Sequence, residues 1–310
     1  MTAPRWFDAD EVDSLVSISG AIAAIEAALL GGLDPSADAA RTAVPVAHGQ
    51  LLLMPAQSLG GVGVKLAAVA PANPAHGLPR IQAVYVFMDP RTLAPVALLD
   101  GVALTSLRTP AMSAVAARRL AEVDATRLVV FGVGPQAQGH VEAMRAIRPI
   151  ADVAVVGRDA ERTARFAQHV GGRVGAIADV AHADIVVCAT SAAEALFDGE
   201  LVRDRACVVA VGSHEPHVRE LDEGLMRRAH VVVEDIGAAL REAGDVIRAG
   251  LSATQLTPVA HLLDAQAVFD DDRPRVFKSV GMAWQDLVVA TEVVRRGGVA
   301  GDQAGSSSSG

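Results

Sequence analysis

Aromatic side chains and long apolar segments are both scarce in this chain of 310 residues. Aromatic residues make up 3% of the sequence, so it lacks the platforms on which single-stranded nucleic acids stack. No uncharged apolar run approaches the roughly 18 to 20 residues of a membrane-spanning helix. Basic charge is also in short supply, because the formal net charge is −9 and non-specific nucleic-acid binding requires a basic surface. We therefore expect neither nucleic acid nor a membrane as a partner.

Cysteine is rare as well, and its placement bears on the compartment. Cys188 and Cys207 both lie in apolar runs typical of strands, which predicts buried thiols in a reducing environment. Residues 1–11 are acidic and lack the basic-then-apolar layout of a signal peptide. We expect a soluble cytoplasmic protein.

Two kinds of catalytic site find no support. In the segment from His214 to His217, Pro216 breaks the helical spacing that a His-Glu-x-x-His zinc site needs. No Gly-x-Ser-x-Gly elbow is present, and neither cysteine sits in a polar turn. We therefore expect no metal and no hydrolase chemistry.

A glycine-rich turn at residues 132–137 carries the strongest local signal. An apolar run ends at Phe131, and Gly132-Val-Gly134-Pro-Gln136-Ala137 leads into a helical pattern. Gly132 permits the tight turn, Gly134 lets the backbone approach a pyrophosphate, and Ala137 lets the helix approach the strand. Although such a motif is weak alone, the strand before it and the helix after it favour a dinucleotide-binding unit over an ordinary glycine-rich turn.

The sequence before this turn predicts a substrate domain. Residues 11–30 have the pattern of an amphipathic helix that Ser19 could cap, and residues 103–123 predict a long helix. Between them, short strands are expected at residues 50–54, 62–69, 81–88 and 95–99. Because no long helices separate these strands, a largely antiparallel or mixed sheet follows.

From residue 127 onward the pattern changes to alternating strands and helices. Near-continuous apolar runs at residues 128–131, 153–156, 185–188, 207–211 and 231–233 are typical of parallel strands covered on both faces. This predicts an α/β fold with a doubly wound Rossmann sheet. Residues 235–265 are expected to be helical and peripheral, and residues 276–296 to form a last helix that could pack back on the first domain.

The expected organisation is therefore discontinuous. Residues 1–120 and 275–300 form an α+β substrate-binding and dimerisation domain, and residues 121–274 form the inserted nucleotide-binding domain. The serine-rich tail, residues 301–310, is expected to be disordered.

The tip of the second nucleotide-domain strand bears on which nucleotide binds. An NAD site usually has a carboxylate there for the ribose 2′-hydroxyl, whereas a nearby arginine accommodates the 2′-phosphate of NADP. Here Gly157 is followed by Arg158 and Asp159. Arg158 favours NADP(H), while Asp159 keeps NAD possible and could alternatively cap the next helix.

Three cations are candidates for holding a substrate carboxylate: Arg41, Lys65 and Arg108. Lys65 lies inside an apolar strand pattern, where a charge needs a partner or a function unless the strand is at an edge. Arg108 lies early in the predicted long helix, where it could instead be an ordinary surface residue.

Motifs spread over most of the chain carry a family resemblance. In the first domain they are Lys65, Pro71-Ala-Asn73-Pro74, Gly77-Leu78-Pro79, Leu99-Asp100-Gly101 and Leu104-Thr105-x-x-Arg108-Thr109. Further on they are Gly132-x-Gly134-x-Gln136-Ala137, Val211-Gly212-Ser213-His214-x-Pro216, Arg219-Glu220-Leu221 and Phe277-Lys278-Ser279-Val280-Gly281-Met282-Ala283-x-x-Asp286. From about Arg41 to the last helix, the chain resembles the ornithine cyclodeaminase/mu-crystallin family.

The resemblance implies roles for several residues and a homodimer of discontinuous two-domain subunits. It implies that Arg41, Lys65 and Arg108 hold the substrate carboxylate. The cofactor residues that it implies, together with those from the glycine turn and the strand tip, are Thr109, Gly132, Gly134, Gln136, Ala137, Arg158, Asp159, Thr190, Ser191, Val211 and Ser279.

Two departures from the family pattern separate its activities. Leu52 stands where cyclodeaminases carry a glutamate, and His214 stands where they carry a catalytic aspartate. An apolar Leu52 offers the side-chain amine of ornithine no acidic partner. The departures favour the family's imine reductases and amino-acid dehydrogenases, with Leu52 and Met54 beside an apolar or small substrate group.

The expected reaction is NAD(P)H-dependent reduction of an imine or ketimine that bears an α-carboxylate, giving an L-amino acid. His214 could donate the proton, since its pKa lies near neutrality, or it could bond ribose or backbone, and Lys65 could polarise the imine or donate the proton instead. The alternatives are ornithine cyclodeamination with catalytic NAD and non-enzymatic binding of a small ligand.

Overall fold

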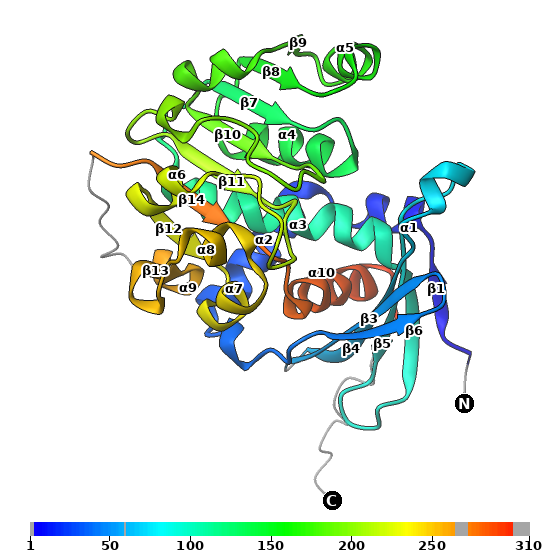
Figure 1. The fold of residues 1–310 in the computed structure, drawn as a ribbon. Helices are drawn as coiled ribbons and strands as arrows, with labels where there is room; N and C mark the ends of the chain where they lie inside the picture. The colour runs from blue at the N-terminus through cyan, green and yellow to red at the C-terminus, as the bar shows by residue number, and fades with distance from the viewer. Residues whose placement is uncertain (1–2, 59, 264–271, 300–310) are drawn as a thin grey trace, which may run out of the picture. The chain divides into compact units, whose positions relative to one another are not determined.

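The computed structural model describes residues 3–58, 60–263 and 272–299, so the predicted disordered tail lies outside the described residues. Figure 1 shows the helices and strands of the chain as a labelled ribbon. Contacts divide the chain into two units. The first unit comprises Met1–Ala24, Asp38–Arg108 and Ala283–Gly310, and the second comprises Ile25–Ala37 and Thr109–Met282. Each unit is built on its own sheet.

The first unit contains a six-stranded mixed sheet. Its strands follow the order β1 (Arg5–Phe7), β6 (Pro95–Asp100), β5 (Ile81–Met88), β4 (Gly61–Val69), β3 (Gly49–Ser58) and β2 (Thr42–Val46). Only the β1–β6 pair is parallel among these. The predicted mixed sheet and its four predicted strands are confirmed, whereas β1 and β2 were not predicted.

The two faces of this sheet differ in burial because side chains alternate along each strand. One face packs against helix α10 (Ala283–Arg296) and carries an aligned row of buried residues, Met54, Lys65, Tyr85 and Leu99. The neighbouring row on the opposite face includes Leu53 and Leu66, which are 37% and 36% exposed. Both faces of the sheet are therefore apolar, but only one is covered within the described chain.

The second unit contains an eight-stranded parallel sheet. Its order is β13 (Leu256–Pro258), β12 (His230–Val233), β14 (Arg275–Lys278), β11 (Cys207–Ala210), β10 (Ile185–Cys188), β7 (Arg127–Phe131), β8 (Asp152–Val156) and β9 (Arg173–Val174). Every residue of β10, β11 and β14 is buried. The predicted Rossmann-type parallel sheet is confirmed.

Helices lead into or connect most of these strands, as expected of such a sheet. They are α3 (Gly101–Leu120), α4 (Pro135–Ile147), α5 (Ala160–His169), α6 (Glu223–Arg228), α7 (Ile236–Glu242), α8 (Gly244–Ala249) and α9 (Val259–Leu262). The chain passes from the first unit to the second within α3.

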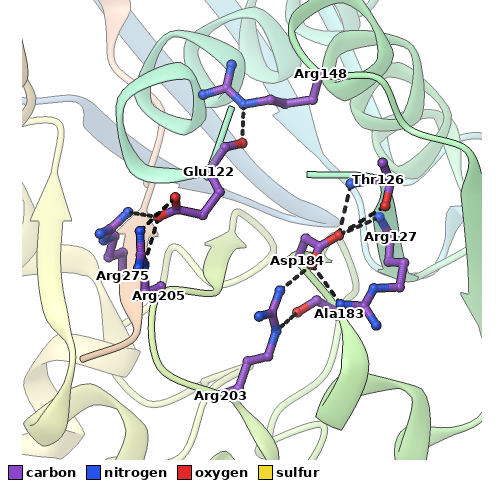
Figure 2. Close-up of polar contacts among 9 residues, drawn as sticks. All are labelled: Glu122, Thr126, Arg127, Arg148, Ala183, Asp184, Arg203, Arg205 and Arg275. Carbon is purple, nitrogen blue, oxygen red and sulfur yellow. Dashed lines mark hydrogen bonds and ion pairs between the residues drawn. The ribbon is translucent and has the colours of Figure 1, made fainter. Parts of the chain in front are cut away.

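The amino ends of the parallel strands are held by two carboxylates (Figure 2). Asp184 accepts hydrogen bonds from the backbone N–H groups of Thr126 and Arg127 at 2.9 and 2.8 Å, and Arg203 pairs with it. Glu122 pairs with Arg205 and Arg275 at 2.9 and 3.0 Å. Because ligands of such sheets bind at the carboxyl ends of the strands, we interpret this network as structural.

The predicted N-terminal helix over residues 11–30 was wrong as one element. Two helices, α1 (Ala9–Leu15) and α2 (Ile18–Leu30), are separated by Val16, which is extended and buried. Ser17, rather than Ser19, accepts a hydrogen bond from the N–H group of Gly20 at 3.2 Å. Among the described residues no single helix could cross a membrane by length and apolarity, although α1 and α2 together, bent by 71°, meet the same criterion.

The predicted last helix over residues 276–296 was also wrong at its start. Residues 275–278 form β14, which pairs with β11 and β12, and helix α10 begins only at Ala283. Gly281 has φ +74 in the turn between them, a conformation that favours glycine. The periodicity of such a short segment does not distinguish a strand from a helix. The same ambiguity concealed the three-residue strand β13 within the segment predicted as helical, residues 235–265.

Candidate active site

Lys65 occupies the middle of β4 with only 3% of its surface exposed. Its ammonium donates hydrogen bonds to Asp286 Oδ2 at 2.7 Å and to Thr105 Oγ1 at 3.1 Å. β4 lies between β3 and β5, so Lys65 is not on an edge strand. The charge is therefore withdrawn from water and held by specific partners.

Arg108 lies on α3 and is 5% exposed, so it is not a surface residue. Its Nε donates to Asp286 Oδ1 at 3.2 Å, and its Nη1 donates to Gln285 Oε1 at 2.8 Å. One fully buried carboxylate thus holds two of the three predicted substrate cations.

The protonation of Lys65 is shifted toward neutrality. Burial, assisted by the charges of Arg108 and Arg41, lowers the pKa of its ammonium from the ordinary 10.5 to about 8, even though the negative charge of Asp286 opposes this shift. An amine with a pKa near 8 is charged at neutral pH and can still release a proton. Lys65 is therefore suited both to binding an anion and to proton transfer.

The remaining residues predicted to contact substrate belong to the same unit. Arg41 is half-buried just before β2, close enough for its charge to affect Lys65. Met54 lies directly across the strand pair from Lys65, and Leu52 lies opposite Ala67 on the same face. Met54 and Leu52 are 4% and 8% exposed, so the surroundings of Lys65 on β3 are apolar.

The glycine turn after β7 has the geometry of a dinucleotide-binding turn. Gly132 has φ +115, and a Cβ there would lie 2.4 Å from the carbonyl oxygen of Ala189. Gly134 precedes α4 without a side-chain cap, and a Cβ there would meet no atom within 4 Å. Ala137 is fully buried. The open space at Gly134 and the uncapped helix start fit a pyrophosphate.

The two residues predicted to bind the nucleotide at the tip of β8 differ in their contacts. Asp159 caps α5, because its Oδ1 accepts a hydrogen bond from the N–H group of Arg162 at 2.9 Å. Arg158 is exposed beside it. A side chain at Gly157 would lie 2.4 Å from Thr163 Oγ1, so the strand tip must remain bare.

A buried glutamate that the sequence analysis did not assign holds the loops after β10 and β11. Glu220 accepts hydrogen bonds from the N–H and hydroxyl groups of Thr190 at 2.8 and 2.7 Å, and from the N–H group of Gly212 at 2.7 Å. Burial raises the pKa of the Glu220 carboxyl. Thr190 is therefore a loop anchor, while Ser191 is exposed and Val211 half-buried next to these contacts.

Glu220 is part of a larger buried network that includes Lys278. The backbone N–H groups of Glu220 and Leu221 both donate to Asp245 Oδ1 at 2.8 Å. Lys278 pairs with Asp245 at 3.2 Å and donates to the carbonyl oxygen of Ser213 at 2.6 Å. The network fixes the backbone just before His214, which is half-buried.

Ser279, a predicted cofactor residue, is 2% exposed, and its hydroxyl donates to Glu234 Oε1 at 2.8 Å. The other oxygen of Glu234 accepts from the N–H groups of Val280 and Gly281 at 2.8 and 2.9 Å. In this structure the Ser279 side chain thus supports the turn after β14. Thr109 follows Arg108 on α3 and is 8% exposed.

The part of the chain that the structure describes contains no group of three or more histidine, cysteine or acidic side chains placed to hold a metal ion. His217 and Glu215 pair at 3.2 Å near the surface.

Residues 6–297 match the model of the ornithine cyclodeaminase/mu-crystallin family. The chain belongs to this family. Ketimine reductase mu-crystallin of Rattus norvegicus is 35% identical over 305 residues, which cover 93% of this chain and 96% of the relative.

Two solved structures extend the similarity to the fold. The Δ1-pyrroline-2-carboxylate reductase of Thermococcus litoralis, in complex with NADH and L-proline, has a TM-score of 0.87 at 26% identity, with 94% of this chain and 97% of that chain covered. An archaeal alanine dehydrogenase dimer with bound NAD has a TM-score of 0.88 at 26% identity, with 94% and 95% covered.

The residues that support the site were not predicted from the sequence; they are chiefly Asp286, Gln285, Glu220, Asp245 and Lys278. Asp286, Glu220 and Lys278 stood within the motifs of the family resemblance, but without a role. The available signal was an ionisable residue within a largely apolar segment, as for Asp286 in α10.

Proposed function

We propose that this protein is an NAD(P)H-dependent reductase that converts an imine or ketimine bearing an α-carboxylate into an L-amino acid. The observation that carries the proposal is the buried pair of cations, Lys65 and Arg108, on one carboxylate. Burying the ammonium of Lys65, whose pKa is about 8, costs free energy. A role in anion binding and proton transfer explains why the protein keeps this lysine buried.

We propose that Arg41, Lys65 and Arg108 bind the substrate carboxylate. Arginine and lysine differ in this task, since a guanidinium can bind both carboxylate oxygens while an ammonium acts as a compact point charge. The apolar Met54 and Leu52 favour a hydrocarbon remainder over a second charged group. A cyclic imino acid with one carboxylate fits these surroundings, and the named activities of the mu-crystallin and pyrroline-carboxylate relatives support this choice.

A reduced nicotinamide dinucleotide with its pyrophosphate at the Gly132–Ala137 turn would supply the hydride that the imine carbon accepts. The chain itself must supply the proton that the imine nitrogen gains as the C=N bond becomes a C–N single bond. Lys65 Nζ is the proposed donor; it becomes a neutral amine and recovers its proton from solvent. His214 is the alternative donor, in keeping with a histidine's ordinary pKa near neutrality.

For the nucleotide we propose NADPH over NADH, with NAD(H) as the alternative. Asp159 is engaged in capping α5, whereas Arg158 at the strand tip is exposed and available to pair with a 2′-phosphate. Dissociation constants of both nucleotides for the wild type and Arg158→Ala test this. A preference for NADH that survives the substitution would contradict it.

The reaction is tested by following NADPH oxidation with a panel of imines. The panel contains cyclic five- and six-membered ketimine carboxylates, pyruvate with ammonia or methylamine, and a mixture that forms iminosuccinate. We expect the cyclic monocarboxylates to react best and an L-amino acid to accumulate. Conversion of ornithine to proline without net nucleotide consumption would indicate a cyclodeaminase instead, and tight nucleotide binding without turnover of any compound would indicate a binding protein.

We also propose that the protein is a homodimer that pairs through the uncovered face of the first unit's sheet. Val44, Leu53 and Leu66 on that face are each more than a third exposed, and exposed apolar patches mark interaction surfaces. A second copy is the proposed occupant because a structural relative is a dimer. The cytoplasm remains the proposed compartment, supported by two free and buried cysteines.

A further inference from the structure

Asp286 links the two best-buried cations of the candidate site. The carboxylate lies on α10 with no exposed surface, and its two oxygens are divided between Lys65 at 2.7 Å and Arg108 at 3.2 Å. Gln285, the preceding residue, gives Arg108 a second acceptor at 2.8 Å. A buried carboxylate with divided oxygens fixes the positions of both cations relative to each other.

Other charged groups near Lys65 set the balance. Arg41 contributes a third positive charge to its surroundings. The carboxylate of Asp38 accepts a hydrogen bond from the N–H group of Trp284 at 3.1 Å, and its negative charge helps to raise the pKa of the Tyr85 phenol. Tyr85, across the strand pair from Lys65, stays neutral, because burial raises the pKa of its phenol well above the ordinary value. Three cations, Lys65, Arg108 and Arg41, therefore outnumber the carboxylate of Asp286, which leaves net positive charge for an incoming carboxylate.

We propose that Asp286 is a positioning residue: a built-in counter-ion that holds Lys65 and Arg108 ready for the substrate carboxylate and keeps the Lys65 ammonium charged until it gives up its proton. This inference rests on the proposed function and deepens it. Without Asp286, burial and the neighbouring arginines would deprotonate Lys65 at neutral pH. With Asp286, the site remains cationic yet can donate a proton.

The lysine content of the chain permits a direct test. Lys65 and Lys278 are the only two lysines in the sequence, and they belong to different units. Protein labelled with ¹³C at the lysine ε-carbon should therefore show two side-chain signals, and Lys65→Met assigns one of them by its loss. The pH titration of the Lys65 signal reports its protonation without any assay of activity, and the Lys278 signal reports whether the second unit remains folded.

The informative variant is Asp286→Asn, which keeps the shape of the side chain and removes its charge. We expect the titration midpoint of Lys65 to fall by about one to three pH units, as it does when an opposite charge is lost. A midpoint that stays unchanged, or rises toward the ordinary 10.5 because water enters, would overturn the proposal. A merely structural role for Asp286 predicts that rise, so the two explanations differ in sign.

Gln285→Met is the matched control, because it removes an acceptor from Arg108 while the contact between Asp286 and Lys65 remains. It should raise the KM for the imine and leave the Lys65 midpoint in place. If Asp286→Asn does not fold, Arg108→Met takes its place. Loss of the arginine charge should raise the titration midpoint of Lys65 while Asp286 still holds it. An unchanged midpoint would contradict the proposal that Lys65 and Arg108 share Asp286 as their counter-ion.

Activity measurements separate this inference from the proposed function. In Asp286→Asn we expect kcat to be lost at neutral pH and partly recovered in more acidic buffer, where Lys65 regains its proton. If the Lys65 midpoint falls as expected but the wild type reduces no imine, the proposed function fails and the counter-ion role stands. If the wild type reduces imines and the midpoint does not fall, only the counter-ion role fails.

Discussion

At the scale of single residues, both lysines of this chain are buried against carboxylates, one in each unit. Such pairs are weak evidence of stability, since the cost of removing two charges from water offsets much of their attraction. Lys65 differs from Lys278 in having two further cations nearby, Arg108 and Arg41. This crowding of positive charge argues for an anionic ligand at Lys65 and for a structural role at Lys278.

Replacement of Lys65 tests the proton transfer. In the wild type, kcat should decline as the pH rises through about 8, because the ammonium that donates the proton is then lost. Lys65→Met should lower kcat/KM by about 10²- to 10⁴-fold and remove this decline. Lys65→Arg is the control: it keeps the charge for the carboxylate but does not release a proton, so KM should suffer less than kcat. If kcat of the wild type does not change across pH 8 and Lys65→Met turns over as fast as the wild type, Lys65 is excluded as the donor. His214→Ala would then be the next variant to measure.

His140 should make the stability of the second unit depend on pH. The imidazole on α4 is fully buried between the carbonyl oxygen of Gln136 at 2.7 Å and Ser113 Oγ at 2.9 Å. Burial lowers its pKa from 6.5 to about 4, so between these values the unfolded chain binds a proton that the folded chain does not. The free energy of unfolding contributed by His140 is thus present above pH 6.5 and lost as the pH falls toward 4.

Between pH 7 and pH 5 this loss should amount to about 2 kcal/mol. Urea unfolding at the two pH values, followed in the wild type and in His140→Gln, checks it. The variant should be less stable at pH 7 but lose less on acidification. His76→Asn, at an exposed histidine, should behave as the wild type does. An equal loss in His140→Gln and the wild type would contradict the assignment.

At the scale of elements, the two glycines of the turn between β7 and α4 serve different purposes. Gly132 is required by the fold, since its φ is +115 and the Ala189 carbonyl leaves no room for a Cβ. Gly134 is not, because the space beside it is open. The fold does not need the open space beside Gly134, and such a space is expected where a ligand binds.

Alanine at each glycine should therefore give opposite phenotypes. Gly134→Ala should melt close to the wild type yet bind the nucleotide about tenfold more weakly or worse, a loss of about 1.4 kcal/mol. Gly132→Ala should destabilise the unit by at least about 1 to 3 kcal/mol, the usual cost of a strained backbone. Thermal unfolding and nucleotide titration measure the two effects. A Gly134→Ala variant that binds the nucleotide normally would remove the turn from the cofactor site.

At the scale of the whole molecule, the first unit's sheet is apolar on both faces, and α10 covers one of them. An exposed apolar face of this kind is normally buried when protein chains associate. A symmetric dimer would bury the same row, centred on Leu53 and Leu66, on both copies.

A charge placed in that row should prevent association. Leu66→Glu is expected to shift the molar mass measured by light scattering from dimer toward monomer, because two desolvated carboxylates would face the same interface. Val123→Glu is the matched control: Val123 is 82% exposed in the second unit and should leave the mass unchanged. Dimers of Leu66→Glu as stable as the wild type would place the interface elsewhere.

The parallel sheet, the mixed sheet, the glycine turn and the unusual position of Lys65 could all be predicted from the sequence. They depend on local periodicity and on single residues with strong conformational or solvation preferences. The sequence did not distinguish β14 from a helix, because a segment of four residues with two apolar side chains is compatible with either until its neighbours in the sheet are known.

The residues that support the site could be identified only from the three-dimensional fold. Asp286 lies 221 positions from Lys65 along the chain, and Glu220 lies 30 positions from Thr190. No periodicity links such pairs, because the fold alone brings them together. A charged residue within an apolar segment indicates from the sequence that it needs a partner. Which residue is that partner depends on how the chain packs.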